Sequence, residues 1–378
     1  MHKVFQLVLI AHFAAGSCGA MIYYVANGGN DSNPGSPDAP FRTLARGVGA
    51  AGPGDTVVVQ DGTYGHETAV SGGDGNSDEN SPVTLHNSGT PDAWITIQAE
   101  HKWGAVLDCE MLCDAYINLG SASYVAIQGF VITHGYKEGI HSNDAAHHIR
   151  LSGNRIEYIA NRVTSANLGL DGMYTNPNCH DFLIDGNVFH DIGRLNASQL
   201  DQGLYLHGWN FTITNNVFYN IPHGWSIQMA SGLSNVLIAN NTFASPAAST
   251  QGGHIMMWNA QSHVVIRNNI FFKPVNHALS RYQSAVVDCT VDHNLVFGVG
   301  SIIQGENGCA LISNQEGMDP LFVNPWIAPY DFHLLPGSPA IGAGAAVPIV
   351  AADLDGNPRA PDMPPDLGAY AYGTPILQ

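Results

Sequence analysis

The sequence predicts an all-β solenoid, a parallel β-helix, because one short phrase recurs seven times between Val125 and Val296. Each copy has an aliphatic residue, two polar or glycine positions, usually an asparagine, and then a bulky apolar residue, as in Ile213–Phe218. The copies begin 24 to 33 residues apart, which matches no helical period and suits one turn of a coil made of several short strands. One turn cannot bury its own apolar face, so we expect the turns to stack around a shared interior.

Stacking aligns equivalent residues of successive turns into two ladders. One ladder holds large apolar side chains that we expect to stack in the core, namely Phe189, Phe218, Phe243 and Phe271, with Ile156 and Val296 at its ends. The other ladder holds Asn154, Asn187, Asn216, Asn241, Asn269 and Asn294. Asparagine tolerates the left-handed conformation of a tight corner, and stacked amides can hydrogen-bond along the axis. We therefore assign these asparagines a structural role.

The segment before the repeats predicts a cap at the N-terminal end of the coil. Ile22–Val25 is expected to form the first strand, and a second strand and turn follow within Asp55–Tyr64. Between them, Phe41–Val48 has apolar residues at helical spacing. A short amphipathic helix there would cover the first turn and protect a sheet edge that otherwise invites aggregation.

The first 20 residues have the layout of a secretory signal, with Lys3 followed by the apolar run Val4–Ala15 and small residues up to Ala20. We expect residues 1–20 to be this signal, residues 21–317 to form the β-helix with its N-terminal cap, and residues 318–378 to form a C-terminal capping segment. No other stretch approaches the roughly 20 apolar residues that cross a bilayer. The predicted protein is a monomer without a transmembrane anchor, located outside the cell, in the periplasm or at the cell surface.

Export makes disulfides possible. Cys289 and Cys309 are 20 residues apart, close to one turn of the coil, and can join neighbouring turns. Cys109 and Cys113 can form a tight local bridge, and no second pair of ligands at zinc-like spacing accompanies them. Cys179 is then left over, and we expect it to be a buried thiol.

The charge balance excludes some partners. With 13 basic and 31 acidic residues, the chain has a formal net charge of −18 at pH 7. This charge argues against nucleic acid as a partner and against simple electrostatic capture of a polyanion.

Several N-terminal motifs resemble the opening of secreted pectin-lyase-fold proteins, in particular certain pectate lyases. These motifs are Tyr23–Gly35, Pro40–Leu44, Gly54–Val57 and Asp61–Tyr64. Near the other end, Asp319–Asn324 and Asp366–Tyr370 resemble the closing segment of bacterial exported proteins with this fold. The resemblance implies a right-handed parallel β-helix similar to polysaccharide-lyase-like repeat proteins. Fold identity alone does not select an activity.

A second set of strands precedes the repeat phrases and can be aligned on Gly139, Gly172, Gly203 and Gly224. Period-two alternation places the next residues, Ile140, Met173, Leu204 and Trp225, inside the coil. The outward residues then form a polar stripe of His141 with Asn143, Tyr174 with Asn176, Tyr205 with His207, and Ser226 with Gln228. In the next turn two registers fit, and they leave open whether His254 and Trp258 join the stripe.

The polar stripe suits an extended polysaccharide substrate, because aromatic faces stack on sugar rings and fixed polar groups recognise hydroxyls. Insertions at residues 160–169 and 193–201 are expected to form a wall beside it. Among the stripe residues and their neighbours, we expect Asn143, Asn176, Gln228 and Trp258 to bind substrate. Asp171 and Asp201, which lie one and two residues before the aligned Gly172 and Gly203, are candidates to hold Ca²⁺, orient a histidine or act as an acid and base.

The leading hypothesis is a polysaccharide lyase that cleaves a uronic-acid-containing glycan by β-elimination. The catalytic candidates are His207 as base, Tyr205 or Tyr174 as acid, and His141. Lyases of this fold often use Lys or Arg as the base and calcium to neutralise the sugar carboxylate. The aligned stripe contains neither Lys nor Arg, which argues against that mechanism here.

Two alternatives remain. In an inverting glycoside hydrolase, Asp171 and Asp201 would be the acid and the base, which requires carboxyl groups roughly 6.5–9.5 Å apart. The acidic net charge also fits a neutral glycan better than a polyuronate. The third hypothesis is a non-catalytic surface glycan-binding protein.

Overall fold

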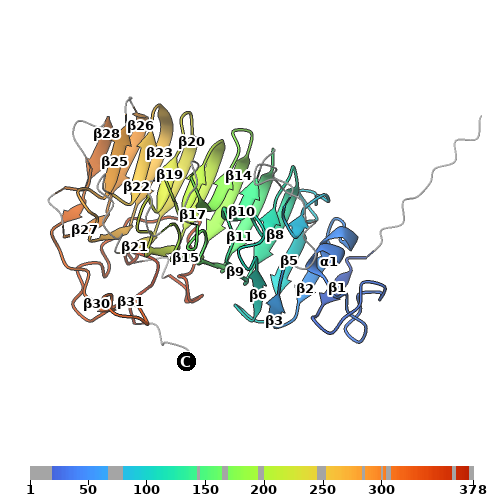
Figure 1. The fold of residues 1–378 in the computed structure, drawn as a ribbon. Coiled ribbons are helices and arrows are strands. Elements are labelled where there is room, and N and C mark those ends of the chain that lie inside the picture. The colour runs from blue at the N-terminus through green and yellow to red at the C-terminus, as the bar shows by residue number, and fades with distance from the viewer. Residues whose placement is uncertain are drawn as a thin grey trace, which may run out of the picture.

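The computed structural model describes residues 19–66, 80–142, 145–163, 169–194, 200–244, 253–282, 286–298, 301–303, 308–359 and 363–373. Turn after turn of the chain adds strands to three parallel sheets, which form an elongated coil (Figure 1). We name these the long sheet, the ten-stranded sheet and the eight-stranded sheet. This architecture confirms the predicted parallel β-helix.

The three sheets run side by side along the coil. The long sheet consists of β1 (Ile22–Val25), β2 (Thr56–Val59), β5 (Ile95–Ala99), β8 (Ser123–Gln128), β11 (His147–Ser152), β14 (His180–Asp185), β17 (Trp209–Thr214), β20 (Ser234–Ala239), β23 (Gln261–Arg267), β26 (Val286–Asp292) and β28 (Cys309–Ile312). The ten-stranded sheet consists of β3 (Gly62–Tyr64), β6 (Ala105–Asp108), β9 (Val131–Thr133), β12 (Arg155–Glu157), β15 (Val188–His190), β18 (Val217–Tyr219), β21 (Thr242–Ala244), β24 (Ile270–Phe272), β27 (Leu295–Phe297) and β29 (Gln315–Glu316). The eight-stranded sheet consists of β4 (Val83–Thr84), β7 (Ile117–Asn118), β10 (Glu138–Ser142), β13 (Asp171–Thr175), β16 (Leu204–Leu206), β19 (Ile227–Met229), β22 (Ile255–Trp258) and β25 (Leu279–Tyr282).

The predicted apolar ladder forms the core of the coil. The rings of Phe189, Phe218, Phe243 and Phe271 are fully buried and stack in register, with successive centroids 4.9, 5.0 and 4.9 Å apart. Ile156 and Val296 continue the column at its two ends. Stacked rings bury large apolar areas and add a favourable ring contact at each step.

The predicted asparagine ladder is also present, and it extends to Asn314. From Asn187 onward, each ladder oxygen accepts hydrogen bonds from the backbone N–H and the side-chain amide of the asparagine one turn before, as between Asn187 and Asn216 at 2.8 and 3.0 Å. The Asn154 oxygen accepts from the Phe130 N–H instead. The left-handed residue of the corner is the one before the ladder asparagine, for example Gly186 (φ 63°) or Asn215 (φ 53°). The ladder asparagines therefore satisfy backbone groups at the corner, and their predecessors make the turn.

The N-terminal cap follows the predicted order. Helix α1 (Leu44–Ala50) begins after Thr43, whose hydroxyl accepts a hydrogen bond from the Arg46 N–H at 3.2 Å, and it buries Leu44 and Val48. Thr43 is a preferred N-cap residue because its oxygen satisfies an unpaired helical N–H.

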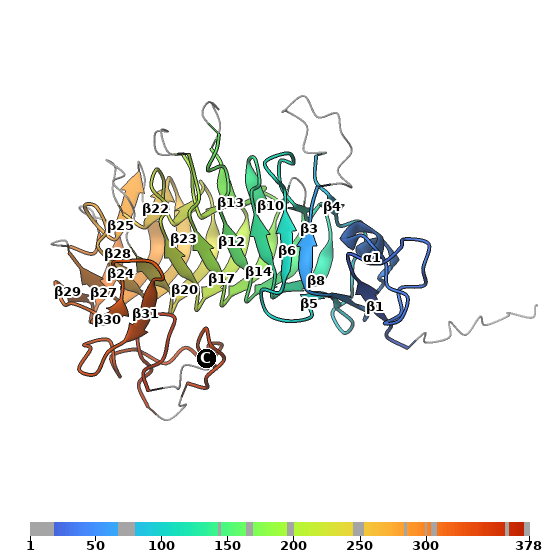
Figure 2. The same ribbon diagram turned by 60° about the horizontal axis from the view of Figure 1, so that its bottom comes forward.

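The C-terminal segment folds back along the coil and covers the outer face of part of the ten-stranded sheet (Figures 1 and 2). Its antiparallel pair β30 (Phe322–Asn324) and β31 (Asp331–Leu334) contributes Phe322 and Phe332 to a second apolar cluster. On the coil side this cluster contains Val217, Phe272 and Leu295. The covered face is thus excluded as a substrate surface.

Both predicted disulfides are present. Cys289 and Cys309 are register partners on β26 and β28 and join adjacent turns, whereas Cys109 and Cys113 close a local loop. Cys179 is a buried thiol whose sulfur lies 3.2 Å from the Ser142 hydroxyl, as the sequence predicts. Within the described part of the chain, no helix has the length and apolar character needed to cross a membrane.

Candidate active surface on the eight-stranded sheet

Four side chains of the predicted polar stripe come together on the eight-stranded sheet, three on neighbouring strands and His207 directly after β16. His141 on β10 is the register partner of Tyr174 on β13, and Tyr174 is the partner of Tyr205 on β16. The rings of His141 and Tyr174 stack with centroids 5.3 Å apart, and His207 lies 5.5 Å from Tyr174 and 4.8 Å from Tyr205. We call these four residues the aromatic cluster.

The backbone of His207 is held in place by Thr175 on the neighbouring turn. The buried Thr175 hydroxyl accepts a hydrogen bond from the His207 N–H at 2.9 Å and donates one to its carbonyl at 3.0 Å. Burial lowers the pKa of His207 below its ordinary value, because a low-dielectric surrounding disfavours the charged imidazolium. A neutral imidazole at neutral pH is the form that accepts a proton.

The pKa values of the two tyrosines of the aromatic cluster are shifted upward. Burial, followed by the neighbouring Tyr205, raises the pKa of Tyr174, and burial and Asp171 raise the pKa of Tyr205. Both phenols therefore stay protonated at neutral pH and can donate a proton or a hydrogen bond. The aromatic cluster thus combines a proton acceptor with two proton donors.

Glu138, which sequence reasoning missed, forms a carboxyl pair with Asp171 next to the aromatic cluster. Glu138 is the register partner of Asp171, both are buried, and a Glu138 oxygen lies 3.6 Å from His141 Nδ1. Burial raises the pKa of Glu138, and burial together with Glu138 raises the pKa of Asp171 well above its ordinary value. The sequence does contain a sign of this pair, because Glu138 directly precedes the aligned Gly139 in the same way that Asp171 precedes Gly172.

Asp171 and Asp201 are not register partners, because Met173 pairs with Leu204 and Asp171 therefore lies opposite Gln202. The Asp171 carboxylate accepts a hydrogen bond from the Gln202 N–H at 3.0 Å. Asp201 is fully buried and binds Arg194 bidentately, accepting from Nε at 3.0 Å and from Nη2 at 2.7 Å. Calcium needs six to eight accessible oxygens. Because Arg194 occupies both Asp201 oxygens, this pair does not fit a calcium site in the folded arrangement.

The predicted substrate-binding residues are spread more widely. Asn143 lies outside the described residues. Asn176 directly follows β13 and is half-buried, while Gln228 is buried and its side-chain oxygen accepts a hydrogen bond from Gln202. Trp258 is exposed on β22 and stacks on Tyr282 with centroids 4.5 Å apart. The predicted wall lies partly outside the described residues, at positions 164–168 and 195–199.

The register of the stripe beyond Tyr205 was predicted wrongly by two residues. Leu204 pairs with Ile227 instead of Trp225, which places Gln228 beside Tyr205 and Met256 beside Gln228. A two-residue shift keeps the inward and outward faces, so Trp225 is still buried. His254 is also buried and does not join an exposed stripe.

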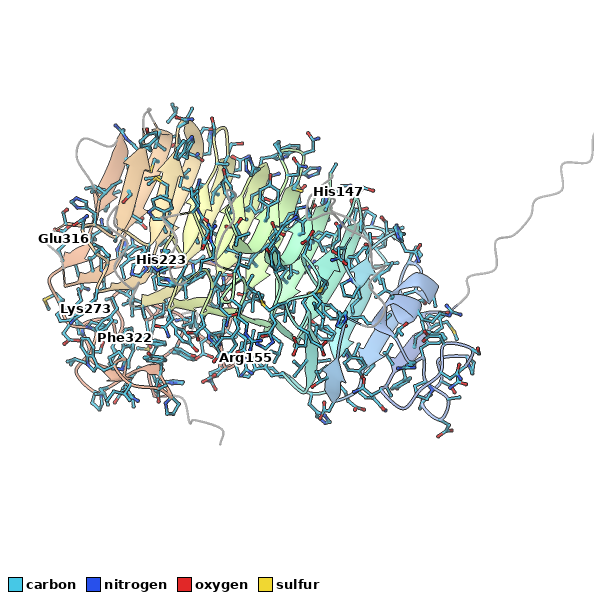
Figure 3. All side chains as sticks on the ribbon, viewed as in Figure 1. His147, Arg155, His223, Lys273, Glu316 and Phe322 are labelled. Atoms are coloured by element: carbon cyan, nitrogen blue, oxygen red, sulfur yellow. A yellow bond between two sulfur atoms is a disulfide. The ribbon has the colours of Figure 1, made fainter. Side chains whose placement is uncertain are left out.

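A second polar surface, which sequence reasoning also missed, lies on the outer face of the long sheet. A hollow of about 510 Å³ is lined there by polar, charged and aromatic residues that include Trp94, Arg150, Asn210 and His263. Figure 3 shows His147 on this part of the coil, far from Phe322 at its C-terminal end. One pattern in the sequence could have indicated this surface. A polar residue recurs three positions before the repeat phrases, as at Asp181 and Asn235.

The coil and its ladders define a pectin-lyase-like right-handed parallel β-helix protein, in agreement with two family models. Residues 23–179 match the Pel9A-like right-handed β-helix region, and residues 198–319 match the general right-handed β-helix region.

Solved structures with the same fold include carbohydrate-active enzymes. Pectate lyase Pel9A is 16% identical with a TM-score of 0.60, over 94% of this chain and 97% of that one. An alginate lyase from Paenibacillus sp. str. FPU-7 is 19% identical with a TM-score of 0.54, over 78% of this chain and 95% of that one. A glycoside hydrolase is 9% identical with a TM-score of 0.50, and the match covers 78% of this chain and 97% of that one. At these identities the likeness shows the fold.

The uncharacterized protein YwoF of Bacillus subtilis (strain 168) is a relative in sequence. It is 28% identical over 156 residues, which cover 38% of this chain. The match spans only 30% of the length of that protein.

Proposed function

We propose that this protein is an exported polysaccharide lyase that cleaves a uronic-acid-containing glycan by β-elimination on the eight-stranded sheet. The observation that carries the proposal is the close approach of His207 to Tyr174 and Tyr205. The similarity of the fold to a pectate lyase and an alginate lyase supports it. The two disulfides fit an oxidising compartment outside the cytosol.

In the proposed reaction, the neutral His207 imidazole takes the proton from C5 of the uronic acid residue. The electron pair of that C–H bond forms the C4–C5 double bond, and the bond from C4 to the glycosidic oxygen breaks. The phenol of Tyr205 or Tyr174 donates a proton to this leaving oxygen. The imidazolium and phenolate then exchange a proton through solvent, and the resting state returns.

His141 is proposed to contact the sugar at the edge of the aromatic cluster. Its ring stacks on Tyr174, and its Nδ1 faces the Glu138 carboxyl. From this position the His141 ring can donate a hydrogen bond toward the negative charge that develops on the substrate carboxylate. This role requires no calcium at Asp171 and Asp201.

The decisive experiment is incubation of the purified protein with polygalacturonate, alginate and neutral glycans, with and without EDTA. A lyase produces unsaturated ends that absorb ultraviolet light, while a hydrolase produces reducing ends without that absorbance. His207→Ala is expected to lower kcat by roughly 10²–10⁴-fold, the range for loss of a general base. His263→Ala, an exposed histidine on the long sheet, is the matched control. Full elimination activity in His207→Ala, or reducing ends alone, contradicts the proposal.

A further inference from the structure

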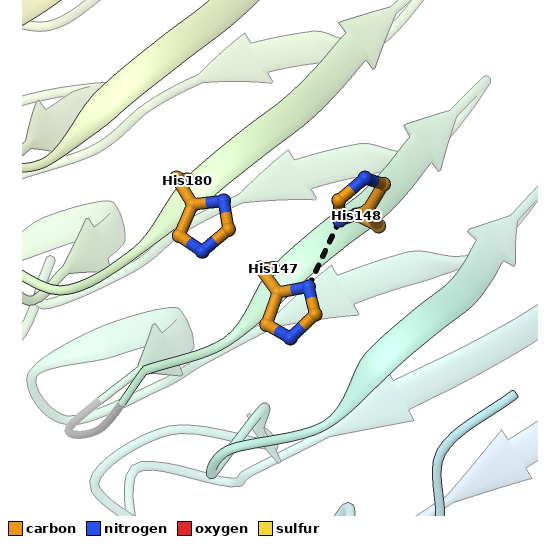
Figure 4. Close-up of side chains that lie close together, drawn as sticks. All are labelled: His147, His148 and His180. Atoms are coloured by element: carbon orange, nitrogen blue, oxygen red, sulfur yellow. Dashed lines mark hydrogen bonds between the residues drawn. The ribbon is translucent and has the colours of Figure 1, made fainter. Parts of the chain in front are cut away.

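Three imidazoles that the proposed reaction does not use gather on the outer face of the long sheet. His147 and His148 lie on β11, and His180 lies on β14 as the register partner of His147 (Figure 4). One ring nitrogen from each of the three lies within 4.8 Å of the others. We call His147, His148 and His180 the histidine cluster.

A backbone irregularity is what brings two consecutive histidines to the same face. Neighbouring residues of a regular strand point to opposite faces. His148 has a left-handed conformation with φ of 53°, and this conformation redirects the chain as in a β-bulge. As a result, Nδ1 of His147 and Nδ1 of His148 are 2.9 Å apart (Figure 4). Asp181 on the next turn has the same conformation, with φ of 59°, which places its carboxylate beside the cluster.

We propose that the histidine cluster is a binding site for a late transition-metal ion, with Zn²⁺ as the reference ion. Nitrogen ligands 2.0–2.1 Å from a tetrahedral zinc lie about 3.3 Å apart. The spacing of His147 and His148 is already close to this value. A ring nitrogen of His180 lies within 4.8 Å of both and has to approach them for one ion to bind all three rings.

Asp181 supplies the support that metal-binding histidines usually have. Its Oδ2 lies 2.6 Å from His180 Nδ1 and 3.7 Å from His148 Nδ1. This carboxylate holds the His180 ring at Nδ1 and adds negative charge beside the three imidazoles, which favours a bound cation. A carboxylate in this position fixes the tautomer and the orientation of the ring.

Aromatic side chains hold the rings from both sides. Tyr124 stacks on His148 with centroids 4.4 Å apart, and Trp209 stacks on His180 at 4.5 Å. The side chains of His148 and His180 are still 36% and 24% exposed, so an ion can reach them from solvent.

The donor set selects the class of ion. Imidazole nitrogen suits Zn²⁺, Cu²⁺ and Ni²⁺, whereas Ca²⁺ and Mg²⁺ require oxygen ligands. Three protein ligands also leave a fourth position for water or another oxygen, as in catalytic zinc sites. His148 and Asp181 also help to line the long-sheet hollow, so the histidine cluster borders that hollow.

The test is a calorimetric titration of the EDTA-treated and dialysed full-length protein with Zn²⁺, with Ca²⁺ in a parallel titration. We expect one Zn²⁺ per chain and no binding of Ca²⁺ that competes with it. The double variant His147→Ala/His180→Ala is expected to lose at least tenfold in affinity, and Asp181→Asn about 10–100-fold. His263→Ala, on the same sheet, is the control and is expected to bind as the wild type does.

A spectroscopic readout separates a built site from scattered surface histidines. Cu²⁺ bound by the cluster is expected to show nitrogen hyperfine splitting in its electron paramagnetic resonance spectrum, and the double variant is expected to lose it. Circular dichroism checks that the variants are folded. The proposal is overturned if the wild type takes up no Zn²⁺, or if the folded double variant binds Zn²⁺ as tightly as the wild type.

Discussion

The side-chain amide of Asn216 donates a hydrogen bond to the side-chain oxygen of Asn241 at 3.0 Å, although the two residues lie on successive turns of the coil. The same amide donates to the Ile184 carbonyl at 2.8 Å, and the Asn216 oxygen accepts from the Asn187 N–H. One buried side chain therefore satisfies polar groups of the turn before and of the turn after its own. Such groups are costly when they are left without partners in a dry interior.

Asn216→Ala is expected to lower the free energy of unfolding by about 2–4 kcal/mol, because it leaves several buried polar groups without partners. Urea denaturation followed by circular dichroism measures this loss. Asn178→Ala is the control, because Asn178 is an exposed asparagine in a turn before the long sheet. Equal midpoints for the two variants contradict a structural role of the ladder.

Phe218→Ala is expected to destabilise the coil by about 3–5 kcal/mol, the usual cost of removing a buried aromatic ring. Phe218 has a stacked ring on either side, at 4.9 and 5.0 Å, so neighbouring side chains cannot collapse into the cavity without breaking the ladder. Phe218→Leu keeps most of the buried volume and is expected to cost clearly less. Thermal unfolding of both variants tests the order.

The buried His254 is expected to make the protein less stable at acidic pH. Burial lowers its pKa to about 3, while an unfolded histidine titrates near 6.5. Between these values the unfolded chain binds more protons than the folded one, so stability is present above pH 6.5 and falls as the pH drops toward 3. His254→Gln removes this titration. Its urea midpoint is expected to fall less than that of the wild type between pH 7 and pH 4, and parallel curves contradict the prediction.

The proposed lyase reaction has its own pH dependence. Because burial lowers the pKa of His207, the imidazole stays neutral below pH 6.5, and the acid limb of kcat/KM is expected below that value. The raised pKa values of Tyr174 and Tyr205 place the alkaline limb above pH 10. Initial rates of formation of unsaturated product across pH measure both limbs. An acid limb at or above pH 6.5 is incompatible with His207 as the base.

The two disulfides are expected to contribute unequally. A chain-entropy account gives about 3 kcal/mol for the loop closed by Cys289 and Cys309 and about 2 kcal/mol for the shorter loop of Cys109 and Cys113. Replacing both cysteines of each pair by serine and comparing urea midpoints tests this order. A larger loss for Cys109→Ser/Cys113→Ser would show that loop closure is not the main contribution.

The sequence alone determined the features that repeat locally. The phrase around Phe218 and Asn216 occurs in turn after turn, so its spacing was enough to predict the coil and both ladders. The N-terminal helix and the pairing of Cys289 with Cys309 also followed from spacing and turn chemistry. These features depend on residue types that recur at a regular spacing, and a single sequence shows that spacing directly.

The tertiary structure decided everything that depends on how one turn lies on the next. The position of Gln228 beside Tyr205, the pairing of Asp201 with Arg194, and the buried pair of Glu138 and Asp171 all depend on inter-turn register and on loops of unequal length. The histidine cluster also required the left-handed backbone of His148, because regular alternation places His147 and His148 on opposite faces. Such contacts arise only when residues distant in the chain become neighbours along the coil axis.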